Sequence, residues 1–185
     1  MATPHAHPPE VTVPPGCEIV ELPLNIGSGR SIFAGLEGPE RMRLRMFKRT
    51  SDGHLVGKAW FGNGAEGPPR NVHGGAVAYV LDEAMGAVGW MNDLPVVAAK
   101  ISFEFLKMSP LLVDFDIQAR VTKSDSRRIH VEAELILPGG VVCVRAQGVF
   151  AVLTPKKLQA LDAAKFDPQG LLKNPKFKWA KDDAR

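Results

Sequence analysis

The stretch that decides the fold lies at residues 71–86 and reads NVHGGAVAYVLDEAMG. Its pattern predicts a helix from Gly74 to about Trp90, and this helix is crowded with glycine and alanine. Each glycine destabilises a helix by about 1 kcal/mol relative to alanine, so such a helix depends on tertiary packing. Small side chains also let another layer come close. The stretch therefore predicts a long helix with a sheet wrapped tightly around it.

Strand patterns stand on both sides of this helix. Before it, Met42, Leu44 and Met46 alternate with Arg43, Arg45 and Phe47 in a period of two. Residues 55–61 return as a second strand after a turn. After it come four more strand-like runs, at residues 96–106, 115–121, 131–137 and 141–153. The connections are short, which favours antiparallel hairpins. We therefore expect an α+β fold with the element order strand, strand, long helix and four strands.

The two ends of the chain differ from this central region. Residues 1–16 contain five prolines and predict a disordered or extended arm, while the glycine-rich residues 17–40 predict a loop or short helix. Thr154 and Pro155 suit the start of a short helix, and residues 166–185 predict a polar surface tail. The expected domains are an N-terminal extension (1–40), a central domain (41–154) and a C-terminal helix and tail (155–185).

The composition predicts a globular protein with no nucleic-acid or membrane role. Of the 185 residues, 45% are hydrophobic and 23% are charged, and the net charge of +3 comes from interspersed signs. The densest basic run, residues 41–49, alternates with apolar residues and is interpreted as the solvent face of a strand. Residues 1–16 lack the apolar core of a signal peptide, and no stretch is long enough to span a membrane. Cys17 and Cys143 are interpreted as free thiols, without zinc-type spacing, in a reducing cytoplasm.

His73, Gly74 and Gly75 stand where the helix begins. The first N–H groups of a helix have no partner within it and carry partial positive charge. They can hold a carbonyl oxygen and stabilise it as it gains negative charge, and glycine lets a substrate approach the backbone closely. The alternative interpretation is that the two glycines only form the turn.

Asp82 lies in the middle of the apolar helix. A carboxylate that a sheet covers is costly unless it is paired or used in chemistry. Its neighbour Glu83 lies about 100° away around the helix, so only one of the two shares the buried face well. The alternative is that one of these carboxylates simply faces solvent.

The spacing of these groups has a consequence for assembly. His73 and Asp82 are nine residues apart in the sequence. That spacing is about 13 Å along one helix, and Gly74 is almost as far from Asp82. A single carbonyl group cannot contact both ends of that span. If Gly74 and Asp82 act together, two chains must contribute, which predicts a symmetric dimer with composite sites.

The combination resembles the PaaI-type hotdog acyl-CoA thioesterases. The resemblance rests on His73–Gly75, on Asp82 nine residues after the histidine, on Gly86 and on the segment Phe105–Leu111. That segment, FLKMSPL, is similar to the family's aromatic-Leu-Arg/Lys-Pro-x-Pro-Leu run, and the whole resemblance covers about residues 40–153. It implies a hotdog fold, hydrolysis of an acyl-CoA to free acid and CoA, and homodimers that often pair into tetramers. It also implies that no metal or organic cofactor is needed.

The same resemblance implies roles for individual residues. Asp82 matches the catalytic carboxylate, which acts as general base or as nucleophile. Gly74 matches the residue whose N–H polarises the thioester carbonyl, and His73 matches a histidine that shapes the turn more than it acts as a base. Glu83 is the alternative carboxylate. The candidate substrate-binding residues are Gly75, Asn71, Glu83, Ala98, Lys107 and Arg70.

The chain departs from the family pattern at three positions. Ala98 stands where many relatives carry a Ser or Thr that helps to hold the water, Gly67 where some carry an amide, and Met108 replaces the first proline. Asn71 could substitute for the amide, or bond locally in its turn. Ala98 motivates an alternative function, a non-catalytic protein that binds or senses acyl-CoA. A hydratase would need a second histidine, for which His130 is the weak candidate.

Substrate recognition is only partly readable. Coenzyme A carries phosphates, so basic side chains are expected at the rim of a site. The candidates are Arg70, Lys107 and Arg128. The candidates for an acyl tunnel, or alternatively for packing in the core, are Met85, Trp90, Phe103 and Phe105.

Overall fold

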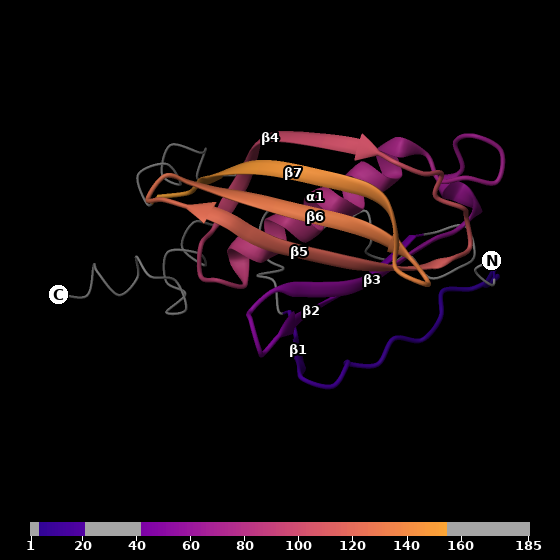
Figure 1. The fold of residues 1–185 in the computed structure, drawn as a ribbon, viewed down its shortest axis with the longest axis horizontal. Coiled ribbons are helices and arrows are strands. Elements are labelled where there is room, and N and C mark those ends of the chain that lie inside the picture. Colours follow the sequence, from indigo (N-terminus) through magenta and orange to yellow (C-terminus); the bar gives the residue numbers. More distant parts are fainter. Residues whose placement is uncertain (1–3, 21–41, 155–185) are drawn as a thin grey trace, which may run out of the picture.

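The computed structural model describes residues 4–20 and 42–154 (Figure 1). Its elements are β1 (Cys17–Ile19), β2 (Met42–Arg49), β3 (Leu55–Phe61), the short 3-10 helix η1 (Asn63–Ala65), α1 (Gly74–Trp90), β4 (Val96–Phe105), β5 (Asp114–Ser124), β6 (Arg128–Leu137) and β7 (Val141–Val152). The expected C-terminal helix and tail lie outside the described residues, as does most of the predicted loop at 17–40. The three domain boundaries therefore stay predictions.

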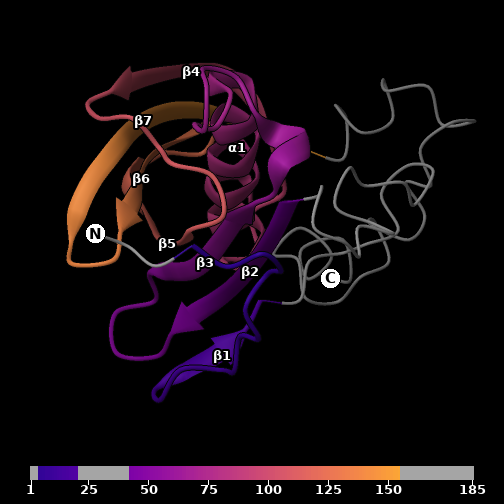
Figure 2. The ribbon, with the colours of Figure 1, turned by 90° about the vertical axis from the view of Figure 1, so that its right-hand side faces the viewer.

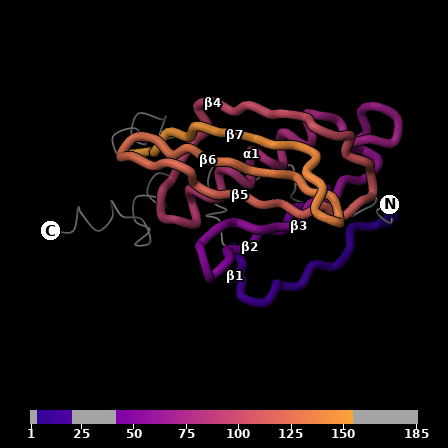
Figure 3. Tube along the Cα trace, viewed as in Figure 1, coloured from indigo at the N-terminus to yellow at the C-terminus, as the bar shows by residue number. Residues whose placement is uncertain are grey.

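One antiparallel sheet contains all seven described strands, in the order β1-β2-β3-β5-β6-β7-β4. The strands β4 to β7 curve around α1, which lies on the concave side of the sheet (Figure 2). The Cα trace shows β4 at one edge of the sheet and β1 at the other (Figure 3). From β2 onward the predicted order of strand, strand, long helix and four strands is confirmed, with the short η1 between β3 and α1. The fold class is also confirmed: an α+β hotdog fold with one long central helix.

The core fills the space between α1 and the concave face. Alternate residues of β5, such as Phe115 and Ile117, point toward the helix and are fully buried, which confirms the period of two in the sequence. The ring of Phe115 meets Phe61 of β3 edge-to-face, with 5.8 Å between centroids. On the helix, Leu81 and Met85 are fully buried against this layer.

Helix and sheet touch closely where the sequence supplies glycine. A Cβ added to Gly89 would lie 2.5 Å from Cγ2 of Val96, at the start of β4. A Cβ on Gly148 of β7 would lie 3.2 Å from the sulfur of Met85. A side chain at either position would push the layers apart, which explains Gly89 in α1 and Gly148 in β7. Gly86 is different, since its Cβ would meet Phe150 at an ordinary 3.9 Å.

One correction concerns β1. Residues 17–40 were expected to form a loop or short helix, but Cys17–Ile19 is a strand that pairs with β2, Cys17 opposite Arg49. It is an edge strand of the sheet, next to β2. Its three residues are too few to show an alternation of polar and apolar side chains, so a sequence pattern does not reveal it.

A second correction concerns Arg43. The basic run was expected to face solvent, but the Arg43 side chain is only 8% exposed and contacts the carboxylate of Asp114 and the carbonyl oxygen of Pro9. The cause is the N-terminal arm, which lies extended across the outer face of β2 and β3. Trp60 Nε1 donates to the His5 carbonyl at 3.2 Å, so the arm covers the row of the sheet that contains Arg43.

Candidate active site

The helix α1 begins at Gly74 because His73 caps it. His73 has extended backbone, with φ −60° and ψ 133°, and its Nδ1 accepts the N–H of Gly75 at 2.9 Å. Its carbonyl oxygen accepts from the N–H groups of Ala76 and Val77 at 2.9 and 3.2 Å. A ring nitrogen that accepts a hydrogen bond has no proton of its own, so the proton of the neutral ring lies on Nε2. This geometry makes His73 a helix cap and a donor, and it leaves Nδ1 unable to act as a base while the cap persists.

The Gly74 N–H is the remaining donor at the helix start. No residue that the structure describes accepts a hydrogen bond from it, whereas the next three N–H groups along α1 are all bonded to His73. The Gly75 N–H, which was a substrate-binding candidate, is thus already taken. The first turn concentrates the positive end of the helix dipole on the Gly74 N–H. This donor can therefore polarise a carbonyl oxygen.

Two loops hold this helix start in place. The N–H of Val72 donates to the carbonyl of Ser109 at 2.8 Å, and the N–H of Leu111 donates to the carbonyl of Arg70 at 3.1 Å. Arg70 adopts the left-handed conformation with φ of 59°, and its side chain is exposed. The His73–Gly75 turn and the downstream segment of the family resemblance, far apart in sequence, are therefore joined by backbone hydrogen bonds.

The departure at Gly67 has a steric reason. A Cβ at Gly67 would lie 2.7 Å from Cα of His73, a distance at which one of the two backbones must move. An amide side chain has no room here. The Asn71 side chain does not replace it, because its Nδ2 donates to the carbonyl of Pro69 at 2.9 Å, a local bond within the turn.

Two half-buried carboxyl groups follow on α1. Burial raises the pKa of Asp82, and no described residue hydrogen-bonds to it or forms an ion pair with it. Burial also raises the pKa of Glu83, with a further contribution from the neighbouring Asp82, while a hydrogen bond to Tyr79 lowers it. Asp82 is thus the carboxylate with unused acceptor capacity, which is what a general base requires. Sequence reasoning missed Tyr79, although its spacing of four residues from Glu83 on one helix was a readable signal.

The edge strand β4 carries two further candidates. Ala98 pairs with Phe150 at a β-bulge and is exposed, and the alternation of β4 and β7 places it on the helix-facing side. Phe105, at the other end of β4, is 57% exposed, and Cζ of its ring lies 3.3 Å from where a Cβ on Gly74 would stand. Lys107 follows just beyond the strand with an exposed side chain. Sequence patterns gave no sign of the contact between Phe105 and Gly74.

Other sequence candidates lie away from the helix start. Met85 is fully buried in the core, which supports the core alternative for this residue. Trp90 and Phe103 are half-buried against the same core. His130 alternates with buried residues of β6 and points to the outer face of the sheet, away from α1. That placement removes the histidine that a hydratase mechanism would need.

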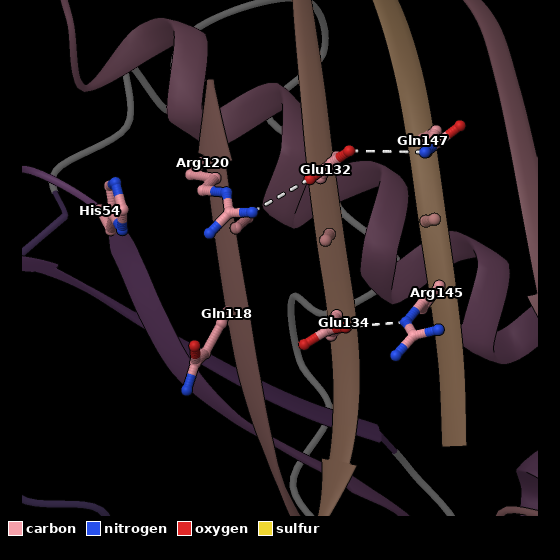
Figure 4. A pocket seen from close by; sticks show the side chains of 10 residues that line it. His54, Gln118, Arg120, Glu132, Glu134, Arg145 and Gln147 are labelled. Carbon is pink, nitrogen blue, oxygen red and sulfur yellow. Dashed lines mark hydrogen bonds and ion pairs between the residues drawn. The ribbon is translucent and has the colours of Figure 1, made fainter. Parts of the chain in front are cut away.

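The outer face of the sheet has a shallow polar hollow of about 310 Å³ over β5, β6 and β7 (Figure 4). Two ion pairs cross it: Arg120 with Glu132 at 3.3 Å, and Arg145 with Glu134 at 3.0 Å. Neither Gly74 nor Asp82 lines this hollow. Its charges neutralise one another within the chain and are exposed, which is typical of the solvated face of an antiparallel sheet.

The described residues contain neither a candidate metal site nor a membrane-spanning helix. Within 4–20 and 42–154, no group of three His, Cys, Asp or Glu side chains is placed to hold a metal ion. No helix in these ranges is long and apolar enough to cross a membrane.

Comparison with known proteins shows what this domain is similar to. Residues 70–144 match the model of the thioesterase superfamily. A crystal structure of a thioesterase superfamily protein is similar with a TM-score of 0.56 and 25% identity over 58% of this chain, a match that spans only 53% of that protein. No protein among the curated sequences matches this chain.

Two other solved structures share the fold at lower identity. One is a hypothetical thioesterase from Streptococcus pneumoniae TIGR4 with coenzyme A, with a TM-score of 0.55, 20% identity and coverage of 60% of this chain and 88% of that one. The other is the E. coli PaaI protein from the phenylacetic acid degradation operon, with a TM-score of 0.52, 15% identity and coverage of 55% and 73%. These two likenesses show the hotdog fold, and the match of residues 70–144 to the thioesterase superfamily supports the resemblance to PaaI-type hotdog thioesterases.

Proposed function

We propose that this protein hydrolyses an acyl-CoA thioester to the free acid and CoA. The observation that carries the proposal is the pair of groups on α1, a Gly74 N–H without a described acceptor and a half-buried Asp82 without a described partner. The match to the thioesterase superfamily and the coenzyme A in the similar Streptococcus pneumoniae structure support it.

The chemistry uses both groups in one step. The Gly74 N–H donates to the thioester oxygen and stabilises the negative charge that develops there. Asp82 takes a proton from a water molecule, and the water oxygen attacks the carbonyl carbon. The tetrahedral intermediate then breaks its C–S bond, and the departing CoA sulfur receives the proton from Asp82. The alternative is that Asp82 attacks the carbonyl carbon directly and the C–S bond breaks to release the CoA thiolate. Water then hydrolyses the resulting anhydride to the free acid and regenerates Asp82.

A raised pKa suits Asp82 to the general-base role. Proton transfer is most efficient when the pKa of the base lies close to the operating pH, and burial moves the pKa of Asp82 in that direction. His73 supports the step by capping the helix rather than by moving a proton. Arg70 and Lys107 remain candidates at the rim for the phosphates of CoA, and both side chains are exposed.

The site is proposed to form between two copies of the chain. Gly74 and Asp82 are eight residues apart on one straight helix. That spacing is about 12 Å, too far for one carbonyl to meet both. The strand β4 lies at an edge of the sheet and exposes the apolar side chain of Val97, which favours pairing with a second copy. A homodimer, alone or paired into a tetramer, would supply the helix start from one protomer and Asp82 from the other.

A second candidate function rests on Ala98. The position faces the helix side of β4 and carries no hydroxyl group to hold a water molecule. A protein with this substitution that binds acyl-CoA without hydrolysing it would be a sensor. A cytoplasmic location remains a prediction from the sequence for either function.

Hydrolysis of a panel of acyl-CoAs by the wild type, Asp82→Ala and Glu83→Gln tests the proposal. We expect turnover of at least one substrate and a loss of about 100-fold or more in Asp82→Ala. Glu83→Gln is the matched control, because it changes the adjacent carboxylate and should retain most activity. Equal rates in wild type and Asp82→Ala would overturn the assignment, and tight binding without turnover would favour the sensor.

A further inference from the structure

Phe105 stands beside the proposed donor without belonging to the core. A Cβ on Gly74 would lie 3.3 Å from Cζ and 3.5 Å from Cε1 of the Phe105 ring, so the ring edge lies beside this glycine on the side where a side chain would project. The side chain is nevertheless 57% exposed. An aromatic ring that covers a helix start and also faces outward can contact whatever binds there.

The backbone at the end of β4 and the ring of Phe103 hold the Phe105 ring in position. The N–H groups of Leu106 and Lys107 both donate to the carbonyl of Cys143, at 2.8 and 3.0 Å, and fix the end of β4. Phe103 lies on the same side of the strand, with its ring centroid 6.4 Å from that of Phe105 and its plane tilted by 38°. Phe103 is itself half-buried against the core. The hydrogen-bonded end of β4 and the neighbouring Phe103 ring therefore hold Phe105 in place.

The Phe105 ring lies near the place where the carbonyl group of a substrate would bind. An oxygen that accepts from the Gly74 N–H lies about 3 Å from the nitrogen, so the atoms attached to the carbonyl carbon lie only a few ångströms further away. The Phe105 ring lies beside the same residue, on the side where a Cβ of Gly74 would project. A substituent on the acyl carbon next to the carbonyl would compete with the ring.

We propose that Phe105 determines acyl specificity by excluding thioesters that are branched at the carbon next to the carbonyl. The inference rests on the proposed hydrolysis and adds the class of substrate, an unbranched acyl group at that carbon. One methyl group in an apolar pocket changes kcat/KM by about 10- to 200-fold. We expect the Phe105 ring to lower kcat/KM for branched thioesters, relative to unbranched ones, by a factor in this range.

Butyryl-CoA and isobutyryl-CoA form the decisive substrate pair. They are isomers, so their apolar content is the same and only their shape beside the carbonyl differs. For the wild type we expect kcat/KM to favour butyryl-CoA by about tenfold or more. In Phe105→Ala the ratio should fall to within about threefold of one, with Phe105→Leu between the two. Leu106→Ala is the matched control, because it removes a neighbouring side chain that is 40% exposed and should leave the ratio unchanged.

The outcomes separate the inference from the function on which it rests. A structural role of Phe105 would lower both rates together and leave the ratio unchanged, which overturns the inference alone. A wild-type enzyme without preference between the two isomers overturns it as well. If the wild type hydrolyses no acyl-CoA in a broad panel, the proposed function fails and the inference fails with it. Thermal unfolding of each variant identifies any that does not fold, in which case Phe105→Leu supplies the ratio.

Discussion

Replacing Gly74 with proline removes one N–H from the helix start and little else. Gly74 is the first residue of α1, a position where helices accept proline because its N–H has no partner within the helix. His73 already has the extended backbone that a residue before proline needs, with φ −60° and ψ 133°. No described residue accepts from the Gly74 N–H, so folding loses no hydrogen bond among the described residues.

The expected loss follows from the role of that donor. Removing one hydrogen-bond donor to a developing oxyanion lowers kcat by about 10²- to 10³-fold, or about 2.7–4 kcal/mol. The substitution also adds a Cβ at 3.3 Å from Phe105, which requires the ring to move by a few tenths of an ångström. Gly74→Ala adds the same atom and keeps the N–H, so its loss should stay below about tenfold.

The assay is kcat of both variants on the best substrate of the wild type, with thermal unfolding to show that each is folded. The account predicts that Gly74→Pro is at least about tenfold slower than Gly74→Ala. If the two variants have the same kcat, the Gly74 N–H is not the donor and the assignment of the helix start is wrong.

The further predictions concern the carboxyl group of Asp82, the buried ion pair of Asp114 and the crowded backbone at Gly67. Since burial raises the pKa of Asp82, kcat/KM should fall with decreasing pH at an acid limb above the ordinary value of 3.8. A raised pKa in the folded state also means that this group stabilises the fold at low pH and that the contribution is lost as pH rises, so Asp82→Asn should raise Tm at pH 7. Asp114→Ala leaves the buried Arg43 unpaired and should lower the free energy of unfolding by about 3–5 kcal/mol in urea titration. Gly67→Ala places a Cβ 2.7 Å from Cα of His73 and should cost about 1–3 kcal/mol of stability together with most of the activity.

Asp114→Ala and Gly67→Ala each have a matched control variant. Asp116 forms its ion pair with Lys58 at an exposed position, so Asp116→Ala should cost less than about 1 kcal/mol, and an equal cost for Asp114→Ala would contradict the buried pair. Gly86→Ala has ordinary room at 3.9 Å from Phe150 and should gain up to about 1 kcal/mol. An acid limb at or below pH 3.8 would show that Asp82 does not titrate as the base.

The sequence predicted those parts of the fold in which one face is buried and the other is not. The alternation along β5 and β6 and the run of small and apolar residues in α1 reflect contact with a single core, and both are visible in a local window. β1 and the burial of Arg43 were missed for the same physical reason. Both depend on contacts between β2 and the N-terminal region, and no local pattern contains that information.

In the candidate site, too, local sequence patterns predicted some features, while others depend on tertiary contacts. The helix start at His73 and the half-buried Asp82 follow from local rules, because glycine, helix position and an isolated carboxylate are properties of neighbouring residues. The contact between Phe105 and Gly74 arises only when β4 folds back over α1, and the crowding of Gly67 against His73 arises only when the loop closes. These tertiary contacts decide how tightly the site is shaped.

The claim that Gly74 and Asp82 act across two chains can be tested by co-expressing Gly74→Pro and Asp82→Ala subunits with different affinity tags. Each variant alone is expected to be inactive. Random pairing puts half of the dimers in mixed form, each with one intact site, so the mixture should recover about a quarter of the wild-type rate. The purified mixed dimer should recover about half of it. A mixed dimer that is as inactive as its parents would contradict the composite site.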